Sequence, residues 1–228
     1  MEHRVGFEPT ALGICNPLHW ASLPPVHDYH YTIISCSRQA VSNNMFKKLN
    51  FRLPELDLSR LKGKFFEEYG DIQRGRFSMY NIKDQEYFEH MISQKLQFHI
   101  KPYITGVSEL PIGSVLPHQD ENSITLNYMI HSANAITLFW KPKNDNVEQE
   151  SLLEMGANIV SGTTGYRQQD LELNGYFQAK DNEAWLLKTD EIHSVVVTNR
   201  TQIRQMLYWR WRYPHTFEEI LNSIEVLQ

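Results

Sequence analysis

Short runs of β-branched and aromatic residues follow one another between residues 103 and 212. They read YITGVSEL, GSVLPH, SITLNYMIH, AITLFW, EAWLLK, HSVVVT and IRQMLYWRWR, and turn-forming Gly, Pro, Asn or Asp residues separate them. In SITLNYMIH, strand alternation places one apolar set on a single face: Ile124, Leu126, Tyr128 and Ile130. This series of strands predicts a mainly β chain with flanking helices, folded as a sandwich or barrel of the jelly-roll kind.

Helical spacing is confined to the flanks of these runs. Apolar spacing predicts a short helix over residues 56–69 and a second helix from Asp84, its N-cap, to Gln97. Thr216 and Glu219 form a capping box ahead of ILNSIEVL, so we expect the chain to end in a helix. The polar stretch 141–183 can hold a short helix, a long loop or a further hairpin, and the sequence leaves these three open.

Charge and cysteine content exclude several classes of protein. Lys and Arg number 22 against 27 Asp and Glu, and this net charge of −5 provides no electrostatic footprint for duplex nucleic acid. No apolar run approaches the roughly 18 residues that span a bilayer, so no membrane association is expected. Both cysteines, Cys15 and Cys36, lie near the N-terminus. The remainder therefore suits a reducing cytoplasm and excludes a disulfide scaffold.

Residues 1–44 differ in character from the rest of the chain. They contain four of the ten prolines, and neither a helical nor a strand period persists in them. The string GFEPTALGICNPLHWASLPP resembles the peptide produced when a transfer-RNA gene is translated by mistake. On this interpretation residues 1–44 are a non-native or disordered extension, and Met45 begins a single domain, 45–228. The alternatives are a flexible tail or a short metal-binding tract formed by His19, His27, His30 and Cys36.

Two segments carry residues suited to metal chemistry. In LPHQDENS, His118 and Asp120 lie two residues apart, which on a strand places both side chains on one face. His193 opens a later β-branched run, and Arg204 follows at the head of the last strand. Two histidines and one carboxylate on one side of an iron leave coordination positions open, as in non-haem Fe(II) oxygenases. An arginine on an adjoining strand can hold a distal carboxylate through a bidentate fork.

This pattern resembles that of the 2-oxoglutarate and Fe(II)-dependent oxygenase superfamily. It consists of the H-x-D motif, the histidine in HSV and the arginine one short loop later. ELPIGSVLPHQD and EAWLLKTDEIHSV resemble the segments that lead to that family's metal ligands, and the resemblance spans about residues 109–211. It implies a double-stranded β-helix, the cupin-like jelly roll, with Fe(II) bound by His118, Asp120 and His193. It also implies that Arg204 binds the C5 carboxylate of 2-oxoglutarate. The implied reaction uses dioxygen to hydroxylate a small-molecule or peptidyl substrate, with release of succinate and CO2.

The sequence departs from the family pattern near this arginine. Many members have a serine two residues beyond it, where this chain has Met206, so the carboxylate lacks that hydroxyl partner. Arg200 is an alternative to Arg204, which is preferred for its offset and because it shares a strand face with Met206 and Tyr208. The segment SITLNYMIHSANAITLFW resembles a subgroup of this family that is common in marine phages and bacteria. Members of that subgroup have an asparagine on the strand after the H-x-D motif. That resemblance implies that Asn127 orients the cosubstrate.

Two other classes of function remain open. A cupin-like metal-dependent enzyme that does not use 2-oxoglutarate would keep the metal ligands and not need Arg204. A non-catalytic jelly-roll binding protein would have lost the activity and kept the fold. Aromatic residues could shield a metal site, although packing is their commoner role: Trp140, Trp185 and Tyr208. The run YWRWRY could stack bases between arginines, but in an acidic chain a packed strand face is favoured.

Overall fold

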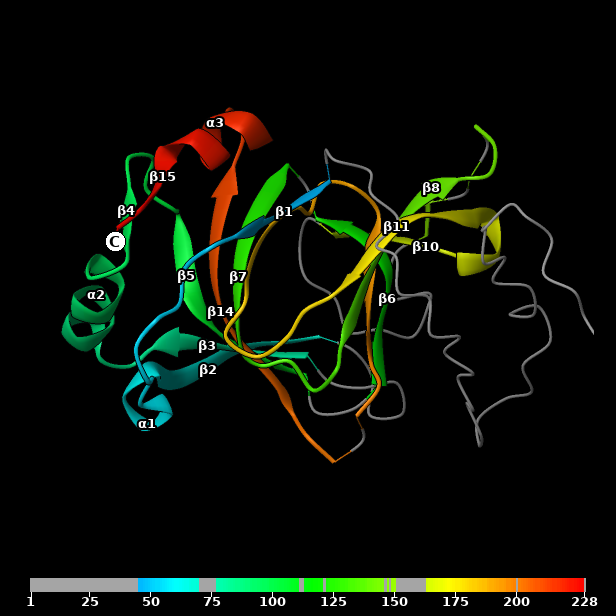
Figure 1. Ribbon diagram of the computed structural model, residues 1–228. Helices are drawn as coiled ribbons and strands as arrows, with labels where there is room; N and C mark the ends of the chain where they lie inside the picture. Colours follow the sequence, from blue (N-terminus) through cyan, green and yellow to red (C-terminus); the bar gives the residue numbers. More distant parts are fainter. Residues whose placement is uncertain are drawn as a thin grey trace, which may run out of the picture. The chain divides into compact units, whose positions relative to one another are not determined.

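Two antiparallel sheets make up most of the computed structural model, which describes residues 45–69, 77–110, 113–120, 122–145, 147, 149–150, 163–199 and 201–227. The larger sheet has seven strands in the order β1-β12-β7-β14-β5-β3-β2, and the smaller has six in the order β11-β8-β13-β6-β10-β9 (Figure 1). The predicted extension 1–44 and the alternative arginine, Arg200, lie outside the described residues.

The strands of the larger sheet are β1 (Phe46–Leu49), β2 (Lys62–Tyr69), β3 (Phe77–Ile82), β5 (Ile104–Leu110), β7 (Ser123–His131), β12 (Ala184–Lys188) and β14 (Arg204–Arg212). Those of the smaller sheet are β6 (Gly113–Asp120), β8 (Ile136–Pro142), β9 (Gln149–Glu150), β10 (Thr163–Tyr166), β11 (Leu171–Gln178) and β13 (His193–Val197). A third, two-stranded sheet pairs β4 (Leu96–Phe98) with β15 (Ile224–Val226).

The path of the chain between the two sheets defines a jelly roll. From β5 to β8 each successive strand crosses to the other sheet, and from β11 to β14 the chain again alternates between them. The second series pairs with the first, because β12 and β14 flank β7 while β13 lies between β6 and β8. This interleaving confirms the predicted mainly β, double-stranded β-helix fold.

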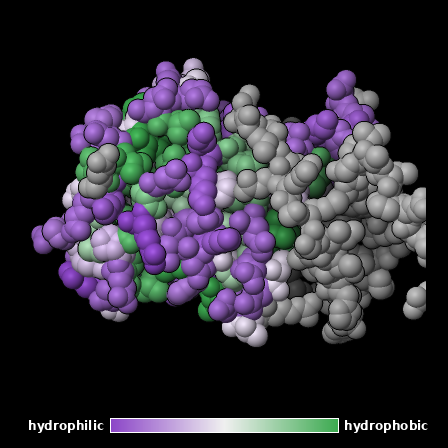
Figure 2. Space-filling view, in the orientation of Figure 1, coloured by the Kyte–Doolittle hydropathy of each residue, from purple (hydrophilic) through white to green (hydrophobic). Residues whose placement is uncertain are grey.

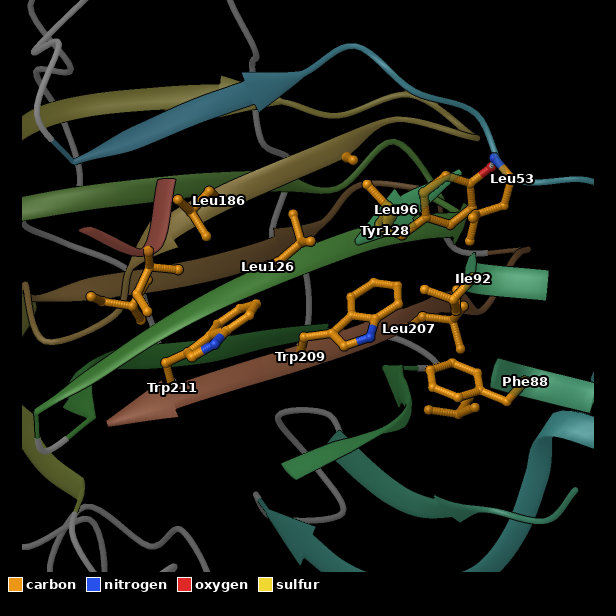
Figure 3. Packing of buried hydrophobic residues seen from close by; sticks show 14 of the residues in the cluster. Leu53, Phe88, Ile92, Leu96, Leu126, Tyr128, Leu186, Leu207, Trp209 and Trp211 are labelled. Carbon is orange, nitrogen blue, oxygen red and sulfur yellow. Dashed lines mark hydrogen bonds between the residues drawn. The ribbon is translucent and has the colours of Figure 1, made fainter. Parts of the chain in front are cut away.

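Both faces of the larger sheet are packed. Towards the smaller sheet, Met129 and Met206 lie in a cluster with Phe139 and Phe177 of that sheet. Towards the helices, Trp209 stacks on Phe88 with ring centroids 6.0 Å apart (Figure 3). The outward cluster also contains the predicted apolar face of β7: Ile124, Leu126 and Tyr128, with Ile130 packed against it. The YWRWRY run is accordingly a strand, and Trp209 and Trp211 are each 1% exposed.

The helix predicted over residues 56–69 is wrong beyond its first turns. A short helix, α1 (Leu58–Leu61), begins at the N-cap Asp57, and the chain then forms β2. Gly63 explains the change, because a Cβ atom there would lie 2.5 Å from the Asn81 carbonyl oxygen of β3. Lys62 also places its Nζ 4.1 Å from the ring centroid of Tyr80. Pairing with β3 therefore overrides the local helical spacing.

The two other predicted helices form but end early. Asp84 caps α2 (Gln85–Ser93) by accepting a hydrogen bond from Tyr87 N at 3.0 Å. Thr216 and Glu219 form the predicted capping box of α3 (Phe217–Ser223). The residues that follow each helix pair with one another as β4 and β15. Each segment had been expected to extend a helix, and a partner distant in sequence makes both into strands.

The polar stretch 141–183 contains strands on both sides of the undescribed residues 151–162. After them come β10, a 3-10 helix (Gln168–Asp170) and β11, which pairs antiparallel with β8 and has one irregularity in its register.

Hydrophilic residues cover much of the face seen in Figure 2, with smaller hydrophobic areas between them. Among the described helices, none is long and apolar enough to cross a membrane.

Candidate functional site

The structure brings the three predicted metal ligands together between two neighbouring strands. His118 and Asp120 end β6, His193 begins β13, and the two histidines are opposite each other in the antiparallel ladder. One possible ligand atom from each residue lies within 4.8 Å of the other two. His118 Nε2 is 3.7 Å from Asp120 Oδ1, and the two imidazole centroids are 4.2 Å apart. The ladder shifts register immediately after His193, and such bulges re-aim side chains.

Backbone carbonyls fix the orientation of both imidazoles. His118 Nδ1 donates to the Leu116 carbonyl at 2.7 Å, and His193 Nδ1 donates to the Glu191 carbonyl at 2.9 Å. A carbonyl oxygen only accepts hydrogen bonds, so the proton of each neutral ring belongs on Nδ1. Nε2 of each histidine then carries a free lone pair. Metal-binding histidines are commonly held in this way by a partner at the other ring nitrogen.

Electrostatics keeps His193 and Asp120 in the protonation states that a cation requires. Burial, reinforced by the neighbouring His118, lowers the pKa of His193 to about 4, so its imidazole is neutral at pH 7. Burial opposes ionisation of Asp120, but Arg210 and the two histidines outweigh it and hold the pKa of this carboxyl below its usual value. A neutral imidazole and an ionised carboxylate are the forms that coordinate metals.

Arg210 holds the outer oxygen of Asp120, a contact that the sequence analysis missed. Arg210 Nη2 lies 3.2 Å from Asp120 Oδ2, whereas Asp120 Oδ1 faces His118. The signal was present, because Arg210 continues the alternating series that starts at Arg204 and passes through Met206 and Tyr208. The arginine thus fixes the direction in which the carboxylate presents its other oxygen.

Arg204 lies on the same inner face of β14 as Met206, which packs between the sheets. Arg204 is 2% exposed, and its Nε has no hydrogen-bond partner among the described residues. Its ladder partner Leu110 packs with Val195 and Val197 of the facing sheet, so the surroundings are apolar. Burial lowers the pKa of Arg204 to about 10. No ion pair with this guanidinium is found among the described residues, and a buried arginine in such surroundings could hold an anion.

Two further inner-face residues have buried polar atoms without a partner in the described part of the chain. These are Ser108 Oγ on β5 and Asn127 Oδ1 on β7. Ser108 is opposite Met206, and Asn127 is opposite Tyr208, so both point into the roll. Buried polar groups are almost always hydrogen-bonded in folded proteins. The inner face of the larger sheet therefore presents polar groups whose hydrogen bonds a ligand could complete.

The three aromatic residues considered as shields divide between the two sides of the roll. Trp185 stacks on Phe177 at 4.2 Å in the inner cluster, and Tyr208 shares the inner face with Asn127. Trp140 lies in a separate cluster on the outer side of the smaller sheet and donates from Nε1 to Ser194 Oγ at 2.8 Å. The prediction that Trp140 could shield the site is therefore wrong, because strand alternation turns it outwards.

The donor set fits a divalent first-row metal. Two imidazole nitrogens and one carboxylate oxygen leave coordination positions open, and this combination of ligand types is one that non-haem iron sites also use. The partners that orient all three ligands are present in the described residues, as expected of a metal site. His118, Asp120 and His193 could therefore hold a metal ion.

Replacement of Arg210 should weaken this site without dismantling it. We expect the Arg210→Met variant to bind Co(II) roughly tenfold to a hundredfold more weakly, because Asp120 loses its orienting partner. Removal of one repelling cation acts in the opposite direction, but the Arg210 side chain is 20% exposed and its repulsion is partly screened. Competition with a chelator measures the affinity for Co(II). The control is the Arg212→Met variant, because Arg212 is an exposed arginine on the same strand. Equal affinities for both variants would exclude the orienting role.

No family model matches the sequence, and no curated protein matches it significantly. The chain is similar in structure to an oxalate decarboxylase from Lactobacillus farciminis, at 12% identity over 72% of this chain and 33% of that one, with a TM-score of 0.31. The CENP-C cumin domain of Drosophila melanogaster gives 7% identity over 69% and 85% of the two chains, with a TM-score of 0.32.

The capsular polysaccharide assembling protein CapF from Staphylococcus aureus gives 10% identity over 72% of this chain and 34% of that one, with a TM-score of 0.30. The chain thus spans about a third of the length of the oxalate decarboxylase and of CapF.

Proposed function

We propose that this protein is an Fe(II)- and 2-oxoglutarate-dependent dioxygenase that hydroxylates a small-molecule or peptidyl substrate in the cytoplasm. The single observation that carries the proposal is the combination of a His-Asp-His group with a buried arginine whose Nε has no partner among the described residues, on the inner face of the same jelly roll. The first feature suits iron, and the second suits the distal carboxylate of a dicarboxylic cosubstrate.

Each residue of the site has a defined task in this proposal. His118 and His193 would coordinate iron through Nε2, and Asp120 would coordinate it through Oδ1 while Arg210 keeps Oδ2 occupied. Iron and 2-oxoglutarate together supply the activation of dioxygen. Arg204 would fix the far end of the cosubstrate, and the apolar residues around it would exclude water from that ion pair.

Asn127 is the remaining predicted cosubstrate residue. Its Oδ1 atom is buried without a partner among the described residues, and it lies between Trp185 of β12 and Tyr208 of β14 in the ladders. We propose that its amide group orients the cosubstrate at the middle of the roll. The amide can present either a donor or an acceptor there, because rotation about its last bond exchanges the two.

Titration of the iron-loaded protein with 2-oxoglutarate under argon tests the proposal. A weak visible charge-transfer band should develop as the keto acid chelates the metal, and succinate should form once oxygen and a suitable substrate are supplied. Iron binding without the band would favour the cupin-like enzyme that does not use 2-oxoglutarate. Failure to bind iron would leave a jelly-roll binding protein.

A further inference from the structure

We propose that Ser108, together with Arg204, forms the anion-binding pair that holds the distal carboxylate of the cosubstrate. The inference rests on the proposed function for the identity of the ligand. It assigns a task to a residue on β5, a strand that contains none of the residues predicted from the sequence to form the site. Ser108 would donate its hydroxyl proton to one carboxylate oxygen while the Arg204 guanidinium donates to the carboxylate from the neighbouring strand.

The strand register places the two residues together on one face. In the β14–β5 ladder Arg204 is opposite Leu110 and Met206 is opposite Ser108, with no shift of register along the pair. Ser108 is therefore the diagonal neighbour of Arg204. Such neighbours have Cα atoms about 7–8 Å apart, a span that a ligand held by a long side chain can bridge. Met206 packs against the facing sheet, which shows that this face is the interior of the roll.

Both residues are buried and both have an atom without a partner. Ser108 is 1% exposed and Arg204 is 2% exposed. Ser108 Oγ and Arg204 Nε make no hydrogen bond within the described part of the chain. Ser108 Oγ could accept a hydrogen bond from Arg204 Nε, but the two atoms form none, so both donor protons are left for another acceptor. A carboxylate has two oxygens with free lone pairs and would satisfy both donors at once.

The same strand pair explains how the site can function with Met206. A hydroxyl at position 206 would point to the same face as one at position 108, because directly opposite residues share a face of the sheet. The partner hydroxyl missing from β14 is thus available from β5. Met206 then serves as an apolar contact in the inner cluster.

The test compares two keto acids that differ in the distal carboxylate. 2-Oxoglutarate and pyruvate chelate iron through the same atoms, but only 2-oxoglutarate has a second carboxylate for Ser108. We expect Ser108→Ala to weaken 2-oxoglutarate binding to the iron-loaded protein roughly tenfold to a hundredfold. This is the change in affinity that corresponds to the loss of one hydrogen bond to a charged group. Its affinity for pyruvate should be unchanged. The anaerobic visible titration measures both affinities.

A stability measurement separates this role from a structural one. Ser108→Ala removes a buried hydroxyl that has no partner in the described part of the chain, so the ligand-free variant should have a Tm roughly 2–10 °C above that of the parent. Ser223→Ala is the matched control, because Ser223 is also buried but donates to the Ile220 carbonyl at 2.8 Å. That control should lower the Tm and leave 2-oxoglutarate affinity unchanged.

A rescue variant completes the design. Ser108→Ala/Met206→Ser moves the hydroxyl across the ladder, and it should bind 2-oxoglutarate more tightly than Ser108→Ala does. Equal weakening of both keto acids, or no weakening of either, in Ser108→Ala would overturn the assignment while leaving the proposed function intact. A parent protein that binds iron but not 2-oxoglutarate would overturn both.

Discussion

The Arg204→Met variant should lose 2-oxoglutarate binding while its free energy of unfolding without ligands increases. Burial lowers the pKa of Arg204 from its usual value to about 10, which corresponds to roughly 3 kcal/mol against the charged form. This cost is present in full at neutral pH, because that pH lies below both pKa values. Methionine has a long side chain without charge and removes the cost. Loss of a buried charge-assisted contact should weaken 2-oxoglutarate binding more than roughly a hundredfold.

Two measurements on the same variant check that it loses affinity for 2-oxoglutarate and gains free energy of unfolding. Urea unfolding of the ligand-free protein should give a free energy higher than the parent's by about 1–3 kcal/mol. The anaerobic titration with 2-oxoglutarate should give no band at concentrations that saturate the parent, although iron still binds. Arg212→Met is the control, since Arg212 is exposed and should change neither value greatly. Unchanged cosubstrate affinity would exclude Arg204 as its anchor, and lower stability would mean that the guanidinium has a stabilising partner.

Strand alternation made most of the jelly roll predictable. SITLNYMIH became β7 with its apolar face in the outward cluster, and its other face, with Met129, in the inner one. Local spacing failed where pairing decides the structure. Residues 62–69 and 96–97 were predicted to be helical, but Gly63 permits close approach to β3 in the first case, and residues 224–226 pair with residues 96–98 in the second. Sequence spacing does not contain such distant partners.

The candidate site was predictable to a similar degree. The two-residue spacing of His118 and Asp120 predicts a shared strand face, because it depends only on backbone geometry. That His193 lies opposite His118 depends on the pairing of β6 with β13, which the family resemblance implied and the residue spacing alone could not. Ser108 had no sequence signal at all. A serine on a strand carries no signal until the register sets it beside a buried arginine whose Nε has no partner among the described residues.

Removal of His193 should abolish stable metal binding. In the His193→Ala variant one of three ligands is lost, and we expect the affinity for Fe(II) or Co(II) to fall roughly a hundredfold to a thousandfold. This is the loss expected if the 10–16 kcal/mol of a four-ligand zinc site is shared evenly among its ligands. The metal-free fold should change little, because His193 is neutral at pH 7 and its ring makes one hydrogen bond, to the Glu191 carbonyl.

Thermal unfolding with and without metal gives the most direct reading of this prediction. A ligand that binds only the folded state raises the Tm, so metal at a concentration that just saturates the parent should stabilise the parent and leave His193→Ala close to its metal-free value. His131→Ala is the matched control, since the His131 side chain is 55% exposed and lies at the end of β7. It should keep the full metal-dependent rise. If His193→Ala retained that rise while His118→Ala and Asp120→Ala did so as well, the metal would bind elsewhere, and the buried Arg204 would have to be explained by an anion that needs no iron.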